Sequence, residues 1–108
     1  MGVDTIRRDG ALCVELSGEL DIGSAAQVES RLLELEDGGA SERIVIDLRS
    51  LGFLDSSGLS LLINADRRAR AAGRRLTVVS GNGVPRRILT TSGVDRLLDT
   101  VEDLEPGA

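Results

Sequence analysis

Hydrophobic and polar residues alternate with a period of two at the start of the chain, which is the pattern of half-buried β-strands. Two such segments, residues 5–8 and 11–17, flank Asp9-Gly10, a dipeptide that favours tight turns. They predict a β-hairpin whose second strand turns alternate aliphatic residues toward a core. Cys13 lies between those residues and faces the other way, so we expect it to have a structural role.

Helical spacing of apolar residues follows the hairpin and predicts a first helix with its inner face on residues 25–35. Ser24 stands at its expected start, and Gln27 three residues later completes the pattern of a capping box. The helix is expected to end at residues 37–39, where Asp is followed by two Gly.

Two further helices are marked by their end residues. The second is expected to begin at Ser56, and Gly73 stops it. The third has Pro85 just inside its start and Gly93 just past its end, as helix preferences require. The inner face of the second helix is expected to comprise Leu59, Leu62, Ile63, Ala65 and Ala69.

Continuous aliphatic runs at residues 44–48 and 76–79 predict buried strands, the first followed by a short loop. Residues 97–104 fit either a short strand or a closing helix, and 105–108 are expected to fray. Strands and helices thus alternate after the hairpin. The order predicts one α/β domain over residues 1–108, with a mixed β-sheet, an N-terminal hairpin and helices packed against it.

The amino-acid composition limits the kinds of functional site that the chain can form. The 108 residues are 41% hydrophobic and 29% charged, which is typical of a folded soluble domain. With no His and one Cys, the chain lacks ligands for a zinc site, and no cofactor is expected. It also lacks a membrane-spanning run and a secretory signal pattern, so we expect a cytoplasmic protein.

Charge argues against nucleic acid as a partner. The formal net charge is −5, and Phe53 is the only aromatic residue that could stack on a base. Gly81-Asn82-Gly83 lacks the lysine of a P-loop and is expected to be a turn. Basic residues gather around the end of the second helix, where we expect a solvated face: Arg67, Arg68, Arg70, Arg74 and Arg75.

Asp55-Ser56-Ser57-Gly58 is the strongest candidate site, because it brings two hydroxyls and a carboxylate to a helix start. The simplest interpretation is structural: Asp or Ser caps the helix and Gly58 relaxes the turn. The functional interpretation is a phosphoacceptor serine, since a helix N-terminus stabilises a phosphate. A nucleophilic serine would need a base, and the chain has no His.

Residues 53–59, Phe-Leu-Asp-Ser-Ser-Gly-Leu after a strand ending Ile-Asp-Leu, resemble the signature of the STAS domain. They are most similar to bacterial anti-sigma factor antagonists. Residues 16–21 resemble the family's turn at the end of a strand, and residues 84–94 its third-helix region. The resemblance covers nearly the whole chain in order and implies a small α/β fold that acts as a regulator and not as an enzyme.

The resemblance also implies which residues form the functional site. Ser56 takes the position of the family's phosphoacceptor, and Asp21 that of a partner contact on a surface turn whose loss should cost little stability. Asp55, Ser57 and Gly58 complete the expected partner-binding surface, together with Ser60, where many relatives carry Gly.

The implied activity is partner switching. The unphosphorylated protein would bind an anti-sigma factor with serine kinase activity and release a sigma factor, and a serine phosphatase would reset it. A monomer or weak dimer is expected, without nucleic acid or membrane contact. Three alternatives remain open: a STAS subunit of a stressosome-like or lipid-transport assembly, a sensor of nucleotides or other small ligands, and an enzyme.

Overall fold

The computed structural model describes residues 1–38 and 43–104 of the chain. Along the chain, the elements are β1 Gly2–Arg8, β2 Ala11–Leu20, α1 Ala25–Asp37, β3 Arg43–Leu54, α2 Ser56–Ala71, β4 Arg75–Val79, α3 Val84–Ser92, the 3-10 helix η1 Val94–Arg96 and β5 Asp99–Val101. The five strands form one sheet in the order β1-β2-β3-β4-β5. The β1–β2 pair is antiparallel and the other three pairs are parallel. The predicted α/β domain with a mixed sheet and an N-terminal hairpin is confirmed.

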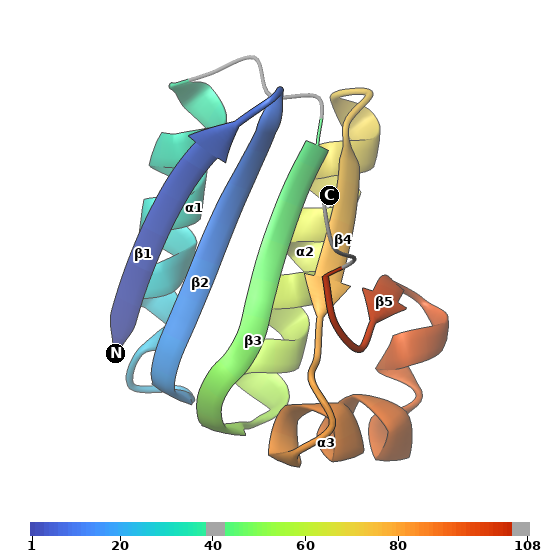
Figure 1. Ribbon diagram of the computed structural model, residues 1–108. Helices are drawn as coiled ribbons and strands as arrows, with labels where there is room; N and C mark the ends of the chain where they lie inside the picture. Colours follow the sequence, from blue (N-terminus) through green and yellow to red (C-terminus); the bar gives the residue numbers. More distant parts are fainter. Residues whose placement is uncertain (39–42, 105–108) are drawn as a thin grey trace.

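The molecule has two layers and an open side. Helices α1 and α2 lie side by side against one face of the sheet, whereas α3 lies at its lower end and packs against β3 (Figure 1). The core fills the space between the sheet and the two helices with aliphatic side chains such as Val14, Leu32 and Leu62. The other sheet face carries no helix in the described part of the chain. No helix of those residues is long and apolar enough to span a membrane.

The hairpin turn is the one that the sequence predicts. Asp9 and Gly10 both have positive φ, 50° and 78°, as a turn matching the strand twist requires. Leu12, Val14 and Leu16 are buried, so the alternating pattern set which face of β2 meets the helices.

The prediction of a loop after the central strand is wrong, because β3 continues without interruption to Leu54. The register with β2 slips twice, so that β3 accommodates two extra residues between Asp47 and Phe53. Such bulges let a strand bend while its backbone stays paired. The pairing carries β3 directly to the start of α2, and the site is therefore built on a strand end and not on a free loop.

The C-terminal segment, for which the sequence left a strand and a helix open, contains the short strand β5. β5 pairs with β4 in parallel, and the described residues up to Leu104 contain no closing helix. Pro85 and Gly93 bracket α3 as predicted, with Gly93 at φ 79° in the left-handed region. The predicted frayed tail at residues 105–108 lies outside the described residues, as does Gly39 at the expected end of the first helix.

Two arginines of the expected solvated face bind α1 instead. Arg74 donates a hydrogen bond to the carbonyl oxygen of Glu36 at 3.2 Å, and Arg68 joins α2 to α1 through its ion pairs. Arg68 of α2 is half-buried and donates hydrogen bonds to Glu36 (2.9 Å) and Glu29 of α1. The hydrogen bond to Glu36 raises the pKa of Arg68 above its ordinary value despite desolvation by burial. Arg67 is exposed, as predicted. Helical periodicity cannot separate these neighbours, since only the position of α1 decides which of them finds carboxylates.

Candidate functional site

Asp55 organises the start of α2. One of its carboxylate oxygens, Oδ1, accepts hydrogen bonds from the backbone N–H groups of Ser57 (2.9 Å) and Gly58 (3.2 Å). The other, Oδ2, accepts from the backbone N–H of Ile22 (3.2 Å), in the loop between β2 and α1. The sequence predicts that either Asp or Ser caps this helix, and the structure shows that the cap is Asp55. The same side chain also fixes a second loop beside the helix.

Because Asp55 performs the capping, the serines that follow it are left free. Ser56 is the first helical residue and is exposed, and its hydroxyl makes no hydrogen bond to any residue that the structure describes. Ser57 is half-buried. Ser60 lies one turn further along α2 and is exposed, so it shares a helix face with Ser56.

Gly58 is required by packing and not by the turn. Its backbone is helical, and a Cβ at this position would lie 2.9 Å from Cγ and 3.0 Å from the carbonyl oxygen of Leu20. The backbone N–H of Asp55 donates to the same carbonyl at 3.1 Å. The interpretation that Gly58 relaxes the turn is therefore wrong: the missing side chain lets α2 begin directly against the end of β2.

Asp21 holds the loop that follows β2. Its Oδ1 accepts hydrogen bonds from the backbone N–H groups of Gly23 (2.9 Å) and Ser24 (3.2 Å). Ser24 does not cap α1 with its side chain, so the predicted capping box with Gln27 is wrong. The Ser24 hydroxyl instead donates backward to the carbonyl oxygen of Glu19 at 2.7 Å. The tight turn points this hydroxyl at the strand end and not at the helix.

The site therefore consists of a strand end, a braced loop and a helix start whose first hydroxyl is free. The family model of the STAS domain matches residues 3–106 of the chain. The anti-sigma F factor antagonist of Paenibacillus polymyxa is 33% identical over 89 residues, which cover 82% of this chain and 76% of that protein. The chain belongs to the STAS-domain family of anti-sigma factor antagonists. These are regulatory proteins and not enzymes.

Solved structures agree with this assignment. The anti-sigma factor antagonist from Mycobacterium paratuberculosis superimposes on the STAS domain with a TM-score of 0.86 and 25% identity, covering 95% of this chain and 86% of that one. The Bacillus cell fate determinant SpoIIAA in its phosphorylated form shares the fold, with a TM-score of 0.69 and 22% identity over 93% and 91% of the two chains.

Two apolar residues of this STAS domain belong to the same edge and are not among the site residues that the sequence predicts. Ile22 is 83% exposed beside Asp55, and Phe53 is 43% exposed near the end of β3. Large apolar side chains that stay exposed next to a polar site are typical of protein interfaces. The available signal was that Ile22 stands between Asp21 and Gly23, outside any strand or helix pattern.

The charge at this edge is negative. Glu19, Asp21 and Asp55 lie at the strand end and in the adjoining loops, and none of them forms an ion pair within the described residues. The described residues also contain no group of three or more potential metal ligands. Further negative charge at Ser56 would meet one favourable element, the N-terminus of α2, and several unfavourable carboxylates.

Replacement of Asp21 by alanine is expected to cost about 1 kcal/mol of stability, because two backbone N–H groups lose their acceptor. This is more than the sequence suggested for a surface turn. Urea unfolding followed by circular dichroism measures the difference. Asp21→Asn keeps an acceptor oxygen and should retain most of the stability, and Glu19→Ala is the exposed control. Equal midpoints for Asp21→Ala and Glu19→Ala would contradict the bracing role.

Proposed function

We propose that this STAS domain binds an anti-sigma factor when Ser56 is unphosphorylated, and thereby releases a sigma factor. The observation that carries the proposal is the free hydroxyl of Ser56 at the first position of α2, exposed and unpaired within the described residues. The relatives that match it act, by name, against anti-sigma factors.

The proposed partner surface surrounds that hydroxyl. Ile22 and Phe53 supply apolar contact area, and Asp21, Ser57 and Ser60 supply polar contacts around it. Asp55 and Gly58 act beneath the surface, since one ties the two loops together and the other lets them approach. The partner therefore meets a largely preformed site, which lowers the entropic cost of binding.

Phosphorylation would switch the site off by local electrostatics. A phosphate adds about −1.5 to −2 charges and three acceptor oxygens. The N-terminus of α2 tolerates that charge in the free protein. In a complex, the phosphate would be removed from water beside Asp55, where desolvation and like-charge repulsion oppose binding. The fold of the Bacillus relative persists in its phosphorylated form, which supports a surface change without refolding.

The enzyme that adds the phosphate is, in this proposal, the anti-sigma factor itself, acting as an ATP-dependent serine kinase. A serine phosphatase removes the phosphate, so that each cycle returns the antagonist to its binding form. The STAS domain needs no cofactor for this role, because the nucleotide belongs to the kinase. The exchange takes place in the cytoplasm, where sigma factors act.

Incubation with the cognate anti-sigma factor and ATP is expected to place one phosphate on Ser56. Tandem mass spectrometry of the tryptic peptide spanning residues 50–67 measures its position, because that peptide contains the rivals Ser50, Ser57 and Ser60. Ser56→Ala should remove the label, whereas Ser57→Ala should retain it. A phosphate found on Ser57 with Ser56 unmodified would overturn the assignment.

A further inference from the structure

Strand β1 forms an outer edge of the sheet. It pairs with β2 on one side, and no strand or helix of the described residues lies beside it on the other (Figure 1). The strand runs over Gly2–Arg8 and is therefore much longer than β5, the strand at the opposite edge. An open edge of this length is a template for pairing with another chain unless its side chains prevent it.

The hairpin decides which backbone groups of β1 face outward. Arg8 flanks the two-residue turn, so its N–H and C=O groups both face the opposite residue of β2. The alternation of an antiparallel pair then directs the backbone groups of Ile6 and Asp4 toward β2, and those of Val3 and Thr5 outward. Neither Val3 nor Thr5 has a backbone partner on the outer side among the described residues. Hydrogen-bonding capacity thus remains at this edge.

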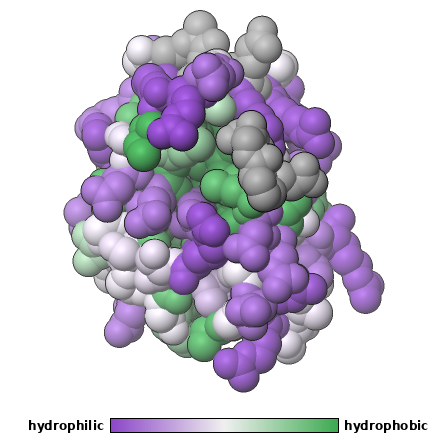
Figure 2. Space-filling view, viewed as in Figure 1, coloured by the Kyte–Doolittle hydropathy of each residue, from purple (hydrophilic) through white to green (hydrophobic). Residues whose placement is uncertain are grey.

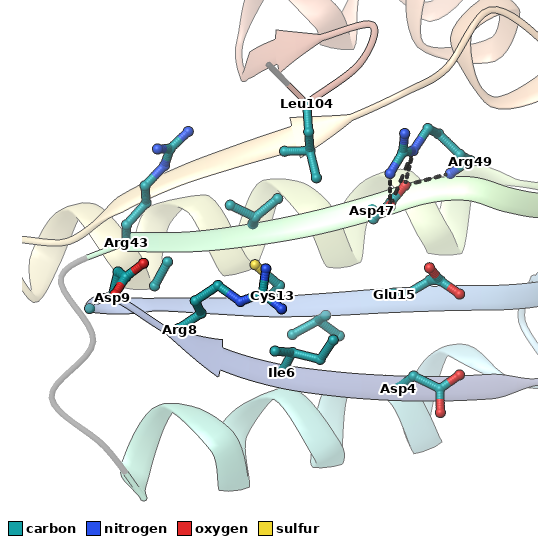
Figure 3. Close-up of a pocket in the computed structure, with 14 residues that line it drawn as sticks. Asp4, Ile6, Arg8, Asp9, Cys13, Glu15, Arg43, Asp47, Arg49 and Leu104 are labelled. Atoms are coloured by element: carbon teal, nitrogen blue, oxygen red, sulfur yellow. Dashed lines mark hydrogen bonds and ion pairs between the residues drawn. The ribbon is translucent and has the colours of Figure 1, made fainter. Parts of the chain in front are cut away.

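Three side chains of β1 lie on the open face of the sheet: Asp4, Ile6 and Arg8 (Figure 3). All three are exposed, and Ile6 is 55% exposed. Neither Asp4 nor Arg8 forms an ion pair with any residue that the structure describes. Asp4 lies directly opposite Glu15 of β2, and like charges in that position destabilise a strand pair. The described part of the chain supplies no counter-charge for Asp4.

Ile6 ends an apolar row that runs across the open face. Cys13 of β2 and Val45 of β3 are its neighbours in the strand register, and all three line a hollow of about 660 Å³. Figure 2 views this face and shows apolar surface bordered by hydrophilic side chains. Val45 is buried whereas Ile6 is exposed, so the row is least covered at the edge of the sheet. The row therefore ends where a further strand could extend it.

We infer that β1 pairs with β1 of a second copy of the chain, in an antiparallel two-fold dimer with one continuous sheet. The two-fold axis passes beside Ile6, so that Ile6 of one copy lies opposite Ile6 of the other. Asp4 then lies opposite Arg8 of the second copy, and the symmetry repeats this contact. In Figure 3 the side chain of Arg8 lies over Cys13, and because it is exposed, a change of rotamer suffices to turn it toward the second copy.

The side chains of β1 favour this register over its neighbours. A shift of two residues in one direction sets Asp4 opposite Ile6, and a shift in the other direction sets Ile6 opposite Arg8. A shift of one residue sets the open face of one copy against the helix-covered face of the other. Only the inferred register joins opposite charges and apolar side chains at the same time, and both kinds of pair stabilise a sheet. Asp9 lies in the turn, beyond the paired segment.

This inference does not depend on the switch at Ser56. The proposed partner surface lies at the end of β3, the start of α2 and the loop after β2, and none of its residues belongs to β1. Phosphorylation of Ser56 can fail while the dimer still forms, and the reverse also holds. Each dimer would carry two copies of the switch.

The dimer is expected to be weak. Two paired edge strands bury less than a standard interface of about 1,600 Å², and each copy has a formal net charge of −5. Sedimentation equilibrium up to millimolar protein measures the dissociation constant, with interference optics because the chain has no Trp or Tyr. A native protein that stays monomeric at millimolar concentration overturns the inference.

Charge reversal tests the assignment to β1. Asp4→Arg and Arg8→Asp each replace two attractive contacts by two repulsive ones, and each is expected to raise the dissociation constant at least about tenfold. The control is Arg87→Asp, at an exposed position of α3 without an ion pair to described residues, which should change it less than about threefold. Circular dichroism verifies folding. Dimers that neither β1 variant weakens form through another surface, which overturns the inference.

A mixture of the two β1 variants tests the register. Asp4→Arg leaves two positive charges on the open face of β1, and Arg8→Asp leaves two negative charges, so each variant repels itself and attracts the other. The equimolar mixture is expected to form a heterodimer with a dissociation constant within about threefold of the native value. A mixture that associates no better than its components contradicts the antiparallel register.

A disulfide tests the position of the axis. Oxidation of Ile6→Cys/Cys13→Ser is expected to link two copies at least about tenfold faster than oxidation of Ile22→Cys/Cys13→Ser, since opposed residues of a strand pair meet the distance that a disulfide requires. Cys13 is replaced because it lies opposite Ile6 within the hairpin and would compete for the introduced thiol. Ile22 is 83% exposed but lies in the loop after β2. Equal rates would indicate random collision and overturn the placement of the axis.

Discussion

Ser56→Asp is expected to fold normally and to lose at least about tenfold in affinity for the anti-sigma factor, which corresponds to about 1.4 kcal/mol or more. Authentic phospho-Ser56 should lose more, because a phosphate carries more charge than a carboxylate. Ser56→Ala should bind like the native protein and should no longer be switched off by the kinase.

The expected loss arises in the complex and not in the free protein. An acidic side chain at the first position of α2 interacts favourably with the helix dipole, so the fold tolerates it. In the complex, the same carboxylate is withdrawn from water beside Asp55, which already uses both oxygens on backbone N–H groups. No positive group within the described residues forms an ion pair with Asp55 to offset the added charge.

Asn64→Asp is the matched control, since it adds the same charge at an exposed position two turns further along α2. It should change the affinity far less than Ser56→Asp. Calorimetry suits the titration because the chain has no Trp or Tyr, and circular dichroism verifies folding. If Ser56→Asp and phospho-Ser56 both bind with native affinity, the hydroxyl is not the switch and the segment serves as a helix start alone.

Gly58→Val is expected to destabilise the domain by about 2–3 kcal/mol and to weaken partner binding as well. A first side-chain carbon at this position would already lie 3.0 Å from the Leu20 carbonyl oxygen, a backbone atom that cannot rotate away. Relief therefore requires α2 to move away from the end of β2. That movement stretches the hydrogen bonds through which Asp55 braces the helix start and the Ile22 loop.

Ser60→Val is the control for this substitution, because it places the same side chain on an exposed position of the same helix. Its cost should stay within about 0.5 kcal/mol. Urea unfolding followed by circular dichroism measures both variants. Equal stability of Gly58→Val and Ser60→Val would show that the contact with Leu20 relaxes freely, and that Gly58 does not fix the geometry of the site.

Patterning along the sequence was sufficient for the order of the main strands and helices and for the N-terminal hairpin. The alternation around Asp9-Gly10 gave the hairpin, and the helical stripe through Leu32 gave the buried face of α1. These features depend on local periodicity, which selects a face without knowledge of what covers it. The candidate segment was found in the same way, because Asp and Ser before an apolar helix mark a helix start whatever its neighbours are.

The roles of individual residues in the site could not be predicted from the sequence, because they depend on contacts between segments that are distant in the chain. Asp55 caps α2 and also binds the loop at Ile22, thirty-three residues away, and no local pattern carries that information. Ser24 has the sequence of a capping box but turns its hydroxyl toward Glu19, since the loop is tighter than the motif assumes. Likewise, the continuation of β3 through its bulges depends on pairing with β2.

By itself, then, the sequence determined the order of the main strands and helices, the buried faces of β2 and α1, and the position of a hydroxyl-rich helix start, because these follow from periodicity and end residues. The buried face of α2 was predicted only in part, since Leu61 and Asp66 are also buried there and Leu59 and Ile63 are only half-buried.

Only the tertiary structure decided three further points. Asp55 caps α2, so that the hydroxyl of Ser56 is not used as the cap, and the absence of a side chain at Gly58 lets Leu20 pack against the helix start. Strand register places Arg8 and Arg43 on the same open face of the sheet as Cys13. The physical reason is the same in each case. A side chain's role is set by the atoms that approach it, and strand register and helix packing bring those atoms from elsewhere in the chain.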